Sequence, residues 1–335
     1  MPPDSAVPPG RAEQMSPSNR WLSVARQTGP LRLILGGARF CVLDYRRSAN
    51  GRAAGKRGNV STADHPVAES ARLAGKVAVV VGAGQTPGET IGNGRATAML
   101  FARAGAQVVA VDRDLAAAQA TMGAISAEGG TAVALAADIT VERDVERLVA
   151  ETVDRQGRID VLHNNVGVSL AAGDGPIAGL SSAAFDLVTA TNLRGMVMTC
   201  KHVLAVMQAQ KAGVIINISS IAAVVDYPNI AYKTSKAGVI ALTENLAITY
   251  ARYGIRVNCI LPGLMNTPMA IEPRVGRDGL SREQVIALRD SSVPLGKMGT
   301  GWDVAEAALF LASPQAGFIT GVALPVDGGQ RLKAG

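Results

Sequence analysis

Ser219, Ser220, Tyr232 and Lys236 are the residues whose types and spacing offer the most chemistry in this chain. Tyr232 and Lys236 are four positions apart, so a helix that begins near Tyr232 places both side chains on one face. A phenol has a pKa of about 10 and is a poor acid or base at neutral pH, unless a neighbouring cation stabilises the phenolate. Lys236 could supply that charge, while a serine hydroxyl holds an alcohol or carbonyl oxygen. Tyr-x-x-x-Lys alone is a weak signal, because many helices carry such a pair on a solvated surface.

The elements that must position these side chains alternate along the chain from about residue 73. Short apolar runs without polar alternation predict strands buried on both faces. These runs are Lys76–Val81, Gln107–Val111, Thr131–Ala136, Val161–Asn164, Val214–Ile218, Arg256–Ile260 and Val322–Val326. Helical patterns cover Arg95–Ala104, Leu115–Glu128, Val141–Gln156, Ser182–Met207, Tyr232–Tyr253 and Asp303–Leu311. This alternation predicts an α/β fold with a Rossmann-type, doubly wound parallel sheet, in a single domain over residues 73–335.

A glycine-rich loop joins the first predicted strand to the first helix. The loop runs from Gly82 to Gly94, and the next strand, Gln107–Val111, ends at Asp112. Strand, glycine loop, helix, strand and acid in this order are typical of a unit that binds a dinucleotide. Glycines let the backbone approach the pyrophosphate, which the amides at the helix N-terminus attract. Asp112 could accept both ribose hydroxyls and repel a 2′-phosphate, which favours NAD over NADP, although Arg113 beside it could hold a phosphate.

Composition and charge exclude several classes of function. The chain has 335 residues, 48% of them hydrophobic, which is enough for the core of one or two domains. The net charge is +6, but residues 1–70 carry ten Lys/Arg against five Asp/Glu, so the remainder is nearly neutral and nucleic-acid binding is disfavoured. The cysteines and histidines are too widely spaced to predict a disulfide framework or a metal site, and they suit a reducing, cytoplasmic compartment. They are Cys41, Cys200, Cys259, His65, His163 and His202.

Residues 1–70 are rich in Pro, Gly, Ser, Ala and Arg and show no sustained periodicity. Their most apolar part, Leu31–Leu43, is too short and too charged to span a bilayer, and it is too interrupted for a signal peptide. No hydrophobic region follows the pair Arg46–Arg47. We therefore expect a disordered basic extension and no membrane association. The alternatives are a targeting arm, sequence translated upstream of the true start, or an extension that brings the protein to a membrane.

Several motifs give the chain a resemblance to a known family. Gly82 and Gly92-Asn93-Gly94 resemble the cofactor loop TGxxxGxG, and Asn164-Asn165-Val166-Gly167 resembles the motif Asn-Asn-Ala-Gly. With the Tyr-x-x-x-Lys pair, these motifs follow the order of the short-chain dehydrogenase/reductase family, in its subfamily of ~250 residues. The resemblance covers about residues 73–332.

The resemblance implies a site that spans most of this length. It implies a catalytic set of Asn192, Ser220, Tyr232 and Lys236, in which Asn192 bends its helix and holds a proton-relay water near the lysine. It also implies that the cofactor contacts Gly82, Gly84, Gly92, Asn93, Gly94, Asp112, Asp138, Ile139, Asn165, Gly167, Tyr232, Lys236, Pro262, Gly263, Met265 and Thr267.

Three departures from the family pattern bear on this reading. Gly82 and Gly92 are ten positions apart, where the family has four, so residues around Gln85–Thr90 are inserted and we expect them to bulge around the adenosine side. Val166 replaces an alanine, which we expect to be tolerated. Ser220 precedes Tyr232 by twelve positions, one fewer than is common, yet as the second serine after the strand it is preferred to Ser219.

The resemblance implies an NAD-dependent oxidoreductase, with NADP possible, that interconverts a small secondary alcohol and a ketone. Tyr232, its pKa lowered by Lys236 and by the positive nicotinamide, would take the hydroxyl proton while hydride passes to the ring. Two alternatives stay open. One is an NADPH-dependent 3-oxoacyl carrier-protein reductase, in which Arg274 and Arg277 could meet a phosphopantetheine; the other is a non-catalytic nucleotide-binding scaffold.

The resemblance also implies a homo-oligomer, a tetramer or dimer, paired through two long helices. Substrate identity depends on the polar segment Met269–Lys297, on the loop Ala222–Ile230 and on the end of the chain.

Overall fold

The computed structural model describes residues 34–35, 38–39 and 71–333. The chain divides into two compact units, Met1–Thr62 and Ala63–Gly335. In the first unit, β1 (Ile34–Leu35) pairs with β2 (Ala38–Arg39) in antiparallel orientation. The predicted disorder of residues 1–70 otherwise lies outside the described residues.

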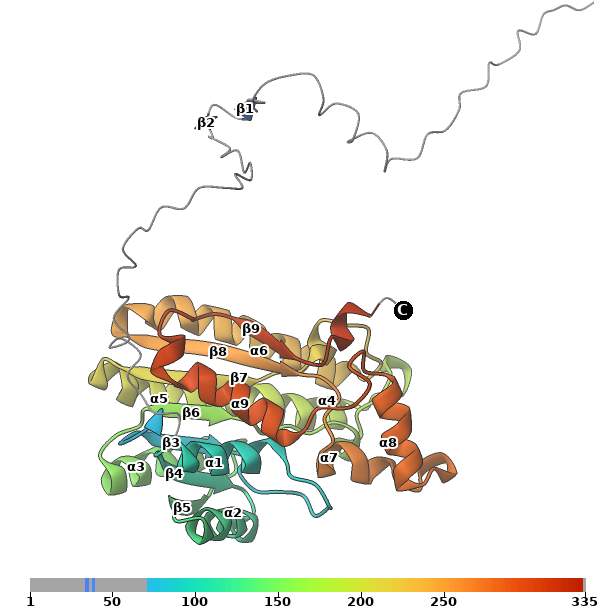
Figure 1. The fold of residues 1–335 in the computed structure, drawn as a ribbon, viewed down its shortest axis with the longest axis horizontal. Coiled ribbons are helices and arrows are strands. Elements are labelled where there is room, and N and C mark those ends of the chain that lie inside the picture. The colour runs from blue at the N-terminus through green and yellow to red at the C-terminus, as the bar shows by residue number, and fades with distance from the viewer. Residues whose placement is uncertain (1–33, 36–37, 40–70, 334–335) are drawn as a thin grey trace, which may run out of the picture. The chain divides into compact units, whose positions relative to one another are not determined.

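Seven parallel strands form the sheet of the second unit, in the order β5-β4-β3-β6-β7-β8-β9 (Figure 1). They are β3 (Val77–Val81), β4 (Gln107–Asp112), β5 (Thr131–Ala136), β6 (Val161–Asn164), β7 (Gly213–Ile218), β8 (Ile255–Pro262) and β9 (Ala323–Val326). β3 pairs with β4 on one side and with β6 on the other, so the chain builds the sheet outwards in both directions. The predicted doubly wound parallel sheet is confirmed.

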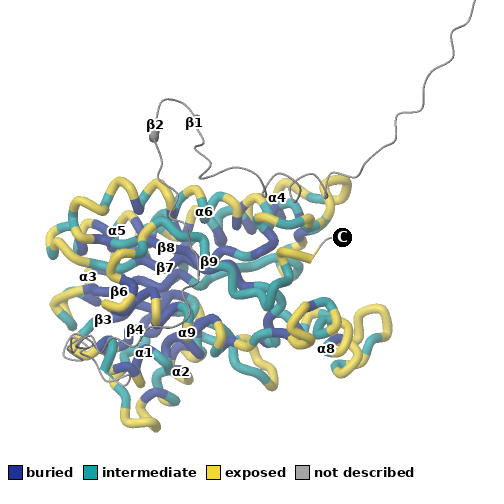
Figure 2. Tube along the Cα trace, turned by 45° about the horizontal axis from the view of Figure 1, so that its top comes forward, coloured by how far each residue is buried: buried dark blue, intermediate teal, exposed yellow. Residues whose placement is uncertain are grey.

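Helices cover both faces of this sheet. One layer contains α1 (Asn93–Arg103), α2 (Leu115–Ala127) and α9 (Gly301–Ala312), and the other contains α3 (Glu142–Gln156), α5 (Gly195–Gln210) and α6 (Ile230–Tyr250). Ala78 and Val80 of β3 pack in the first core, and Val77 and Val79 pack in the second. A single apolar run thus supplies both cores, because successive strand residues point to opposite faces. Figure 2 shows the strands buried between helices whose outer sides are exposed.

The helix predicted over Ser182–Met207 is interrupted. α4 (Ser182–Thr189) is separated from α5 by a π-helical turn, Ala190–Arg194, and this turn carries Asn192. A π turn adds a residue to the helix and is frequent at functional sites. The helix bend that the family resemblance implies at Asn192 is thus a π-helical turn.

The polar sequence of the segment after β8 predicts no particular helix there. It contains α7 (Pro268–Ile271) and α8 (Arg282–Ser291), and a capping box formed by Ser281 and Gln284 begins α8. Both helices lie beside the carboxyl ends of the strands (Figure 1). Within the described part of the chain, no helix is long and apolar enough to cross a membrane.

His163 lies in β6 at the centre of the sheet and is completely buried. Neither ring nitrogen has a hydrogen-bond partner among the described residues, and the ring packs edge-on against Phe101, with 6.1 Å between centroids. Burial lowers the pKa of His163 to about 3, because the imidazolium would lose its hydration.

We expect His163 to make the protein less stable as the pH falls from about 6.5 towards 3. In this range the unfolded chain binds a proton at His163 and the folded protein does not, so the free energy of unfolding falls by about 1.4 kcal/mol per pH unit. His163→Leu should remove this contribution while it keeps an apolar side chain of similar volume. Urea unfolding at about pH 7 and about pH 5 measures the difference. An equal loss of stability in the wild type and the variant would contradict this expectation.

Candidate active site

A cleft of about 780 Å³ opens at the carboxyl ends of the strands. It lies beside the point between β3 and β6 where the order of the strands in the sheet reverses. In open parallel sheets, ligands bind in this crevice. Residues at or just after six strand ends line it: Gly82, Asp112, Asp138, Asn165, Ser219 and Gly263. Every site residue predicted from the sequence lines this cleft, with the exception of Asn192.

Glycines at the start of α1 bring two backbone segments into contact. A Cβ atom on Gly94 would lie 1.9 Å from the Gly82 carbonyl oxygen, a distance that no side chain can occupy. Asn165 holds the same loop to the end of β6, because its Nδ2 donates to the Gly82 carbonyl oxygen at 3.1 Å. Gly92 and Asn93 line the cleft at the N-terminus of α1, where backbone N–H groups and the helix dipole favour an anion.

The inserted segment Gln85–Thr90 does not bulge around the adenosine side, so this prediction was wrong. Arg282 of α8 lies 3.0 Å from the Glu89 carboxylate. Gly88 approaches Glu272, where an added Cβ would lie 2.6 Å from Oε1. The ion pair and this close packing direct the insertion towards the segment that follows β8.

Asp112, at the end of β4, accepts two backbone hydrogen bonds. Gly84 N donates to Oδ2 and Asp114 N donates to Oδ1, each at 3.1 Å. Gly84 packs closely on this carboxylate: a Cβ there would lie 2.5 Å from Asp112 Oδ2, so a larger residue would displace the acid. The carboxylate lines the cleft, and each oxygen retains a lone pair for a further donor. Arg113 also lines the cleft, but it is exposed.

Tyr232 and Lys236 lie in the first two turns of α6 and on one face, as their spacing predicted. Lys236 Nζ is 5.7 Å from the centre of the Tyr232 ring and donates to the Ile218 carbonyl oxygen at 2.8 Å. The two serines have different roles. Ser219 Oγ donates to the Lys236 carbonyl oxygen at 2.7 Å, whereas the Ser220 hydroxyl interacts with the Tyr232 phenol. Ser220 is therefore the serine placed to hold an oxygen beside the phenol.

Burial dominates the protonation of both groups. It raises the pKa of Tyr232 to about 12, although the Ser220 hydroxyl opposes the rise. It lowers the pKa of Lys236 to about 8, so the lysine keeps most of its charge at neutral pH. The expectation that the pKa of Tyr232 is lowered is wrong for the protein without its cofactor. Desolvation of the phenolate outweighs the other effects on Tyr232.

Asn192 lies behind the cleft and is completely buried. Its Oδ1 accepts from Val168 N at 2.8 Å, and its Nδ2 donates to the Val168 carbonyl oxygen at 2.9 Å and to Ser235 Oγ at 3.2 Å. Gly167 lies next to both Asn192 and Lys236: a Cβ on it would be 3.7 Å from Asn192 Oδ1 and 3.3 Å from Lys236 Nζ. Asn192 therefore joins the π turn to α6 and to the segment after β6. Its part in a proton relay stays a prediction.

Asp174 positions Tyr232 and was missed in the sequence. Its carboxylate accepts from Ala231 N at 3.1 Å and from Tyr232 N at 3.0 Å, and so caps the N-terminus of α6. The N-cap residue itself, Asn229, makes no side-chain cap bond. A buried carboxylate is favoured there by the helix dipole. No motif or periodicity linked Asp174 to a helix 57 positions away.

The turn after β8 forms the other end of the cleft, which is lined by Pro262, Gly263, Met265 and Thr267. The C-terminal segment packs directly on this turn, because a Cβ on Gly263 would lie 2.7 Å from Asp327 Cα. Gln330 holds it in place, since its Oε1 accepts from Leu264 N at 3.0 Å.

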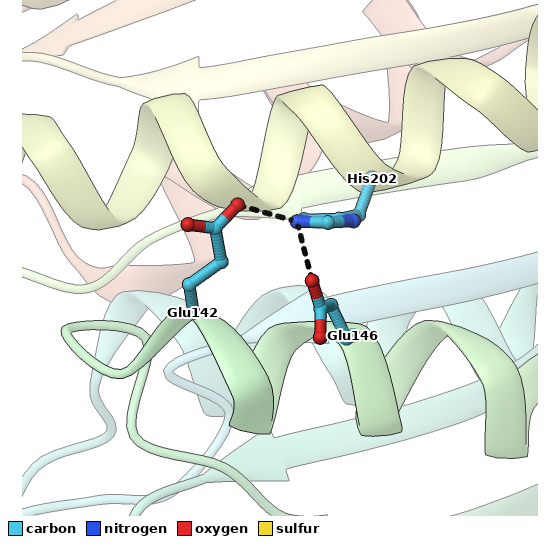
Figure 3. Close-up of side chains that lie close together, drawn as sticks. All are labelled: Glu142, Glu146 and His202. Atoms are coloured by element: carbon cyan, nitrogen blue, oxygen red, sulfur yellow. Dashed lines mark hydrogen bonds and ion pairs between the residues drawn. The ribbon is translucent and has the colours of Figure 1, made fainter.

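Glu142 and Glu146 of α3 approach His202 of α5 outside the cleft (Figure 3). His202 Nε2 is 3.0 Å from Glu142 Oε1 and 4.0 Å from Glu146 Oε1. Lys201 Nζ is 2.6 Å from the same Glu142 oxygen, and its hydrogen bond and that of His202 lower the pKa of Glu142. These contacts account for the cluster as an ion-pair network between two helices, and we assign no metal to it.

The cleft offers groups that fit a nicotinamide dinucleotide. Asn93 Oδ1 is buried at the N-terminus of α1 and has no hydrogen-bond partner among the described residues. Gly94 leaves room for a close approach to the same backbone, and the Asp112 carboxylate lies at the end of the neighbouring strand. Lys236 lies towards the turn after β8, since it bonds to Ile218 at the end of β7, which pairs with β8.

Comparisons with known proteins place this chain among oxidoreductases. A family model described as enoyl-(acyl carrier protein) reductase matches residues 89–331. The chain is 39% identical over 249 residues to the hydroxy(phenyl)methyl-succinyl-CoA dehydrogenase subunit BbsD of Thauera aromatica, covering 74% of this chain and 96% of that protein. It is 38% identical over 255 residues to the 2-(R)-hydroxypropyl-CoM dehydrogenase of Xanthobacter autotrophicus, covering 76% of this chain and 97% of the relative. A solved structure from Burkholderia xenovorans, described as a short-chain dehydrogenase/reductase, is 40% identical in sequence and has a TM-score of 0.72. The match covers 79% of this chain and 100% of that protein's chain.

Proposed function

Because the chain belongs to the short-chain dehydrogenase/reductase family, whose members act on CH–OH groups with a nicotinamide cofactor, we propose that it interconverts a secondary alcohol and a ketone with NAD. The observation that carries this proposal is the environment of Tyr232. Its phenol lies in the cleft, where it interacts with the Ser220 hydroxyl and has the buried Lys236 ammonium 5.7 Å from its ring.

The side chains suggest how the proton moves. Ser220 would hold the substrate oxygen by a hydrogen bond, and Tyr232 would take the hydroxyl proton during oxidation and return it during reduction. Lys236 would stabilise the phenolate that forms in between. A bound nicotinamide supplies the hydride acceptor or donor and, when oxidised, a positive charge. Because the pKa of Tyr232 is raised to about 12, the phenol is protonated at neutral pH and is ready to donate in the reductive direction.

The carboxylate of Asp112 supports NAD as the cofactor. At the end of β4 it is placed to accept ribose hydroxyls, and its charge would repel a 2′-phosphate. The same carboxylate disfavours the alternative of an NADPH-dependent 3-oxoacyl carrier-protein reductase. Arg113 is exposed and is the group that would hold a phosphate if NADPH were preferred.

A cytoplasmic, homo-oligomeric enzyme remains a proposal from the family resemblance. The helices involved in pairing would be α5 and α6, and α6 exposes the apolar Ile248, which is 79% accessible. Light scattering of the purified protein would give the mass of the assembly.

The two adjacent serines give a matched test of this function. We expect Ser220→Ala to lower kcat/KM by about 10²-fold or more, because the substrate oxygen loses a donor beside the phenol. Ser219→Ala should leave kcat/KM within a few-fold and cost about 1 kcal/mol of stability, since it removes a buried bond to the Lys236 carbonyl. The assay follows nicotinamide absorbance with NAD and a panel of secondary alcohols, and with NADH and the corresponding ketones. A larger loss of activity in Ser219→Ala than in Ser220→Ala would contradict the assignment.

A further inference from the structure

Two arginines at the substrate end of the cleft form no ion pair with any carboxylate of the described residues. Arg274 lies in the segment after α7 and Arg289 lies in α8, and both line the cleft that contains Tyr232. Arg274 Nη1 donates to the Ala270 carbonyl oxygen at 2.6 Å, and Arg289 Nε donates to Met298 Sδ at 3.3 Å. Neither guanidinium has a carboxylate within 4.0 Å in the described part of the chain.

A third arginine of the same segment shows the usual arrangement. Arg282 lies 2.6 Å from the Glu272 carboxylate and 3.0 Å from that of Glu89, so two acids compensate it. Asp290, which adjoins Arg289 in the chain, raises the pKa of Arg289 through its charge, but it forms no ion pair with that guanidinium, and its Oδ1 accepts from Met298 N at 2.7 Å. The segment thus contains acidic groups, but they do not pair with the two arginines of the cleft.

Arg274 and Arg289 line the same cleft as the phenols of Tyr227 and Tyr232. Burial and the charge of Arg274 lower the pKa of Arg289 to about 10, while the Tyr227 phenol and the Asp290 carboxylate oppose the change. Arg274 also acts on the pKa of Tyr232, whose ring is 5.8 Å from that of Tyr227. The effect of Arg274 on Arg289 indicates that the two positive charges repel each other, and no carboxylate of the described residues lies within ion-pair distance to offset that repulsion.

We propose that Arg274 and Arg289 bind an oxyanion of the substrate, so that this enzyme acts on hydroxy or keto compounds that carry a carboxylate, sulfonate or phosphate group. A guanidinium presents several N–H donors in one plane and binds such groups through charge-assisted hydrogen bonds. An oxyanion between the two arginines would relieve their repulsion and fix the carbinol beside Tyr232. This inference rests on the proposed function, because it names the substrate class of the same site.

A binding experiment tests the anion site without knowledge of the substrate. The NADH-saturated protein is titrated by calorimetry with propanoate, ethanesulfonate and ethyl phosphate, and with ethyl methyl sulfone as a neutral analogue. Saturation with NADH keeps the anions away from the site of the pyrophosphate. We expect at least one anion to bind and the sulfone not to bind, and the preferred anion identifies the group. Binding of no anion, or equal binding of the sulfone, would overturn the proposal.

Matched variants locate the binding. Arg274→Met and Arg289→Met keep an unbranched apolar stem and remove a charge that has no carboxylate within ion-pair distance among the described residues, so folding should not suffer. We expect each to weaken anion binding by about 10-fold or more. Arg277→Met is the control, because Arg277 is exposed in the same segment and does not line the cleft. Unchanged affinity in both cleft variants would refute the assignment.

Turnover separates this inference from the proposed function. We expect a higher kcat/KM for acetoacetate than for its methyl ester, by about 10-fold or more, and a ratio near one in Arg289→Met with the change mainly in KM. Tyr232-dependent reduction of the ester without a preference for the anion would overturn the inference and leave the function intact. If the protein binds neither NADH nor NADPH but still binds anions through these arginines, the proposed function is overturned and the anion site remains. If neither ketone is reduced, the binding experiment decides.

Discussion

Tyr232→Phe should reduce kcat by about 10³-fold or more and leave the Kd for NADH within about twofold of wild type. The substitution removes only the hydroxyl that exchanges the proton with the substrate. The ring keeps its place in α6 beside Tyr227, and Asp174 continues to cap the helix through backbone amides. The measurements are steady-state turnover, followed by nicotinamide absorbance, and a fluorescence titration with NADH.

Tyr250→Phe is the matched control for this substitution. Tyr250 belongs to the same helix, but it packs with the core formed by α3, α5 and α6 and does not line the cleft. It should therefore keep wild-type kcat. Near-normal turnover in Tyr232→Phe would exclude the phenol as the group that transfers the proton, whatever the behaviour of the control.

The second large effect is expected for Gly94→Ala. Its new methyl group would have to lie 1.9 Å from the Gly82 carbonyl oxygen, so the glycine loop and α1 must move apart. Such overpacking costs about 3 kcal/mol, and here the displaced atoms are backbone atoms that cannot turn aside. The movement also spoils the approach of the backbone to the pyrophosphate, so the Kd for NADH should rise by about 10-fold or more. Urea unfolding and fluorescence titration measure the two effects.

Gly123→Ala provides the opposite case within the neighbouring helix. Gly123 is exposed in α2, and a Cβ there meets nothing within 4 Å. Replacing a helical glycine by alanine should therefore stabilise the protein by about 0.5–1 kcal/mol and leave NADH binding unchanged. Similar stabilities for the two variants would show that the contact between Gly94 and Gly82 is not as tight as the structure has it.

The pattern of apolar residues along the chain was enough to predict the parallel sheet and its helices. Apolar runs such as Val77–Val81 predicted strands buried on both faces, and the structure confirms that their residues contribute alternately to two cores. The positions of Tyr232 and Lys236 followed from helical periodicity alone. The glycines of the loop predicted an approach of the backbone to the pyrophosphate, which stays a prediction; the close packing of Gly94 on the Gly82 carbonyl was not foreseen.

Features that depend on distant partners could not be predicted in the same way. Asp174 looks like an ordinary loop acid until the fold brings it to the amides of Tyr232 and Ala231. The direction of the inserted loop depends on an ion pair between Glu89 and Arg282, which are far apart in the chain. The pKa of Tyr232 depends on its burial, which the spacing to Lys236 does not contain.

The most direct test of the proposed function is a fluorescence titration with NADH and with NADPH, on the wild type and on Asp112→Ala. The titration needs no substrate and reports on the carboxylate that is hydrogen-bonded to the backbone amides of Gly84 and Asp114. We expect the wild type to bind NADH about 10²-fold more tightly than NADPH, and the variant to lose most of this preference. Tighter binding of NADPH by the wild type, or binding of neither nucleotide, would contradict an NAD-dependent enzyme in this cleft.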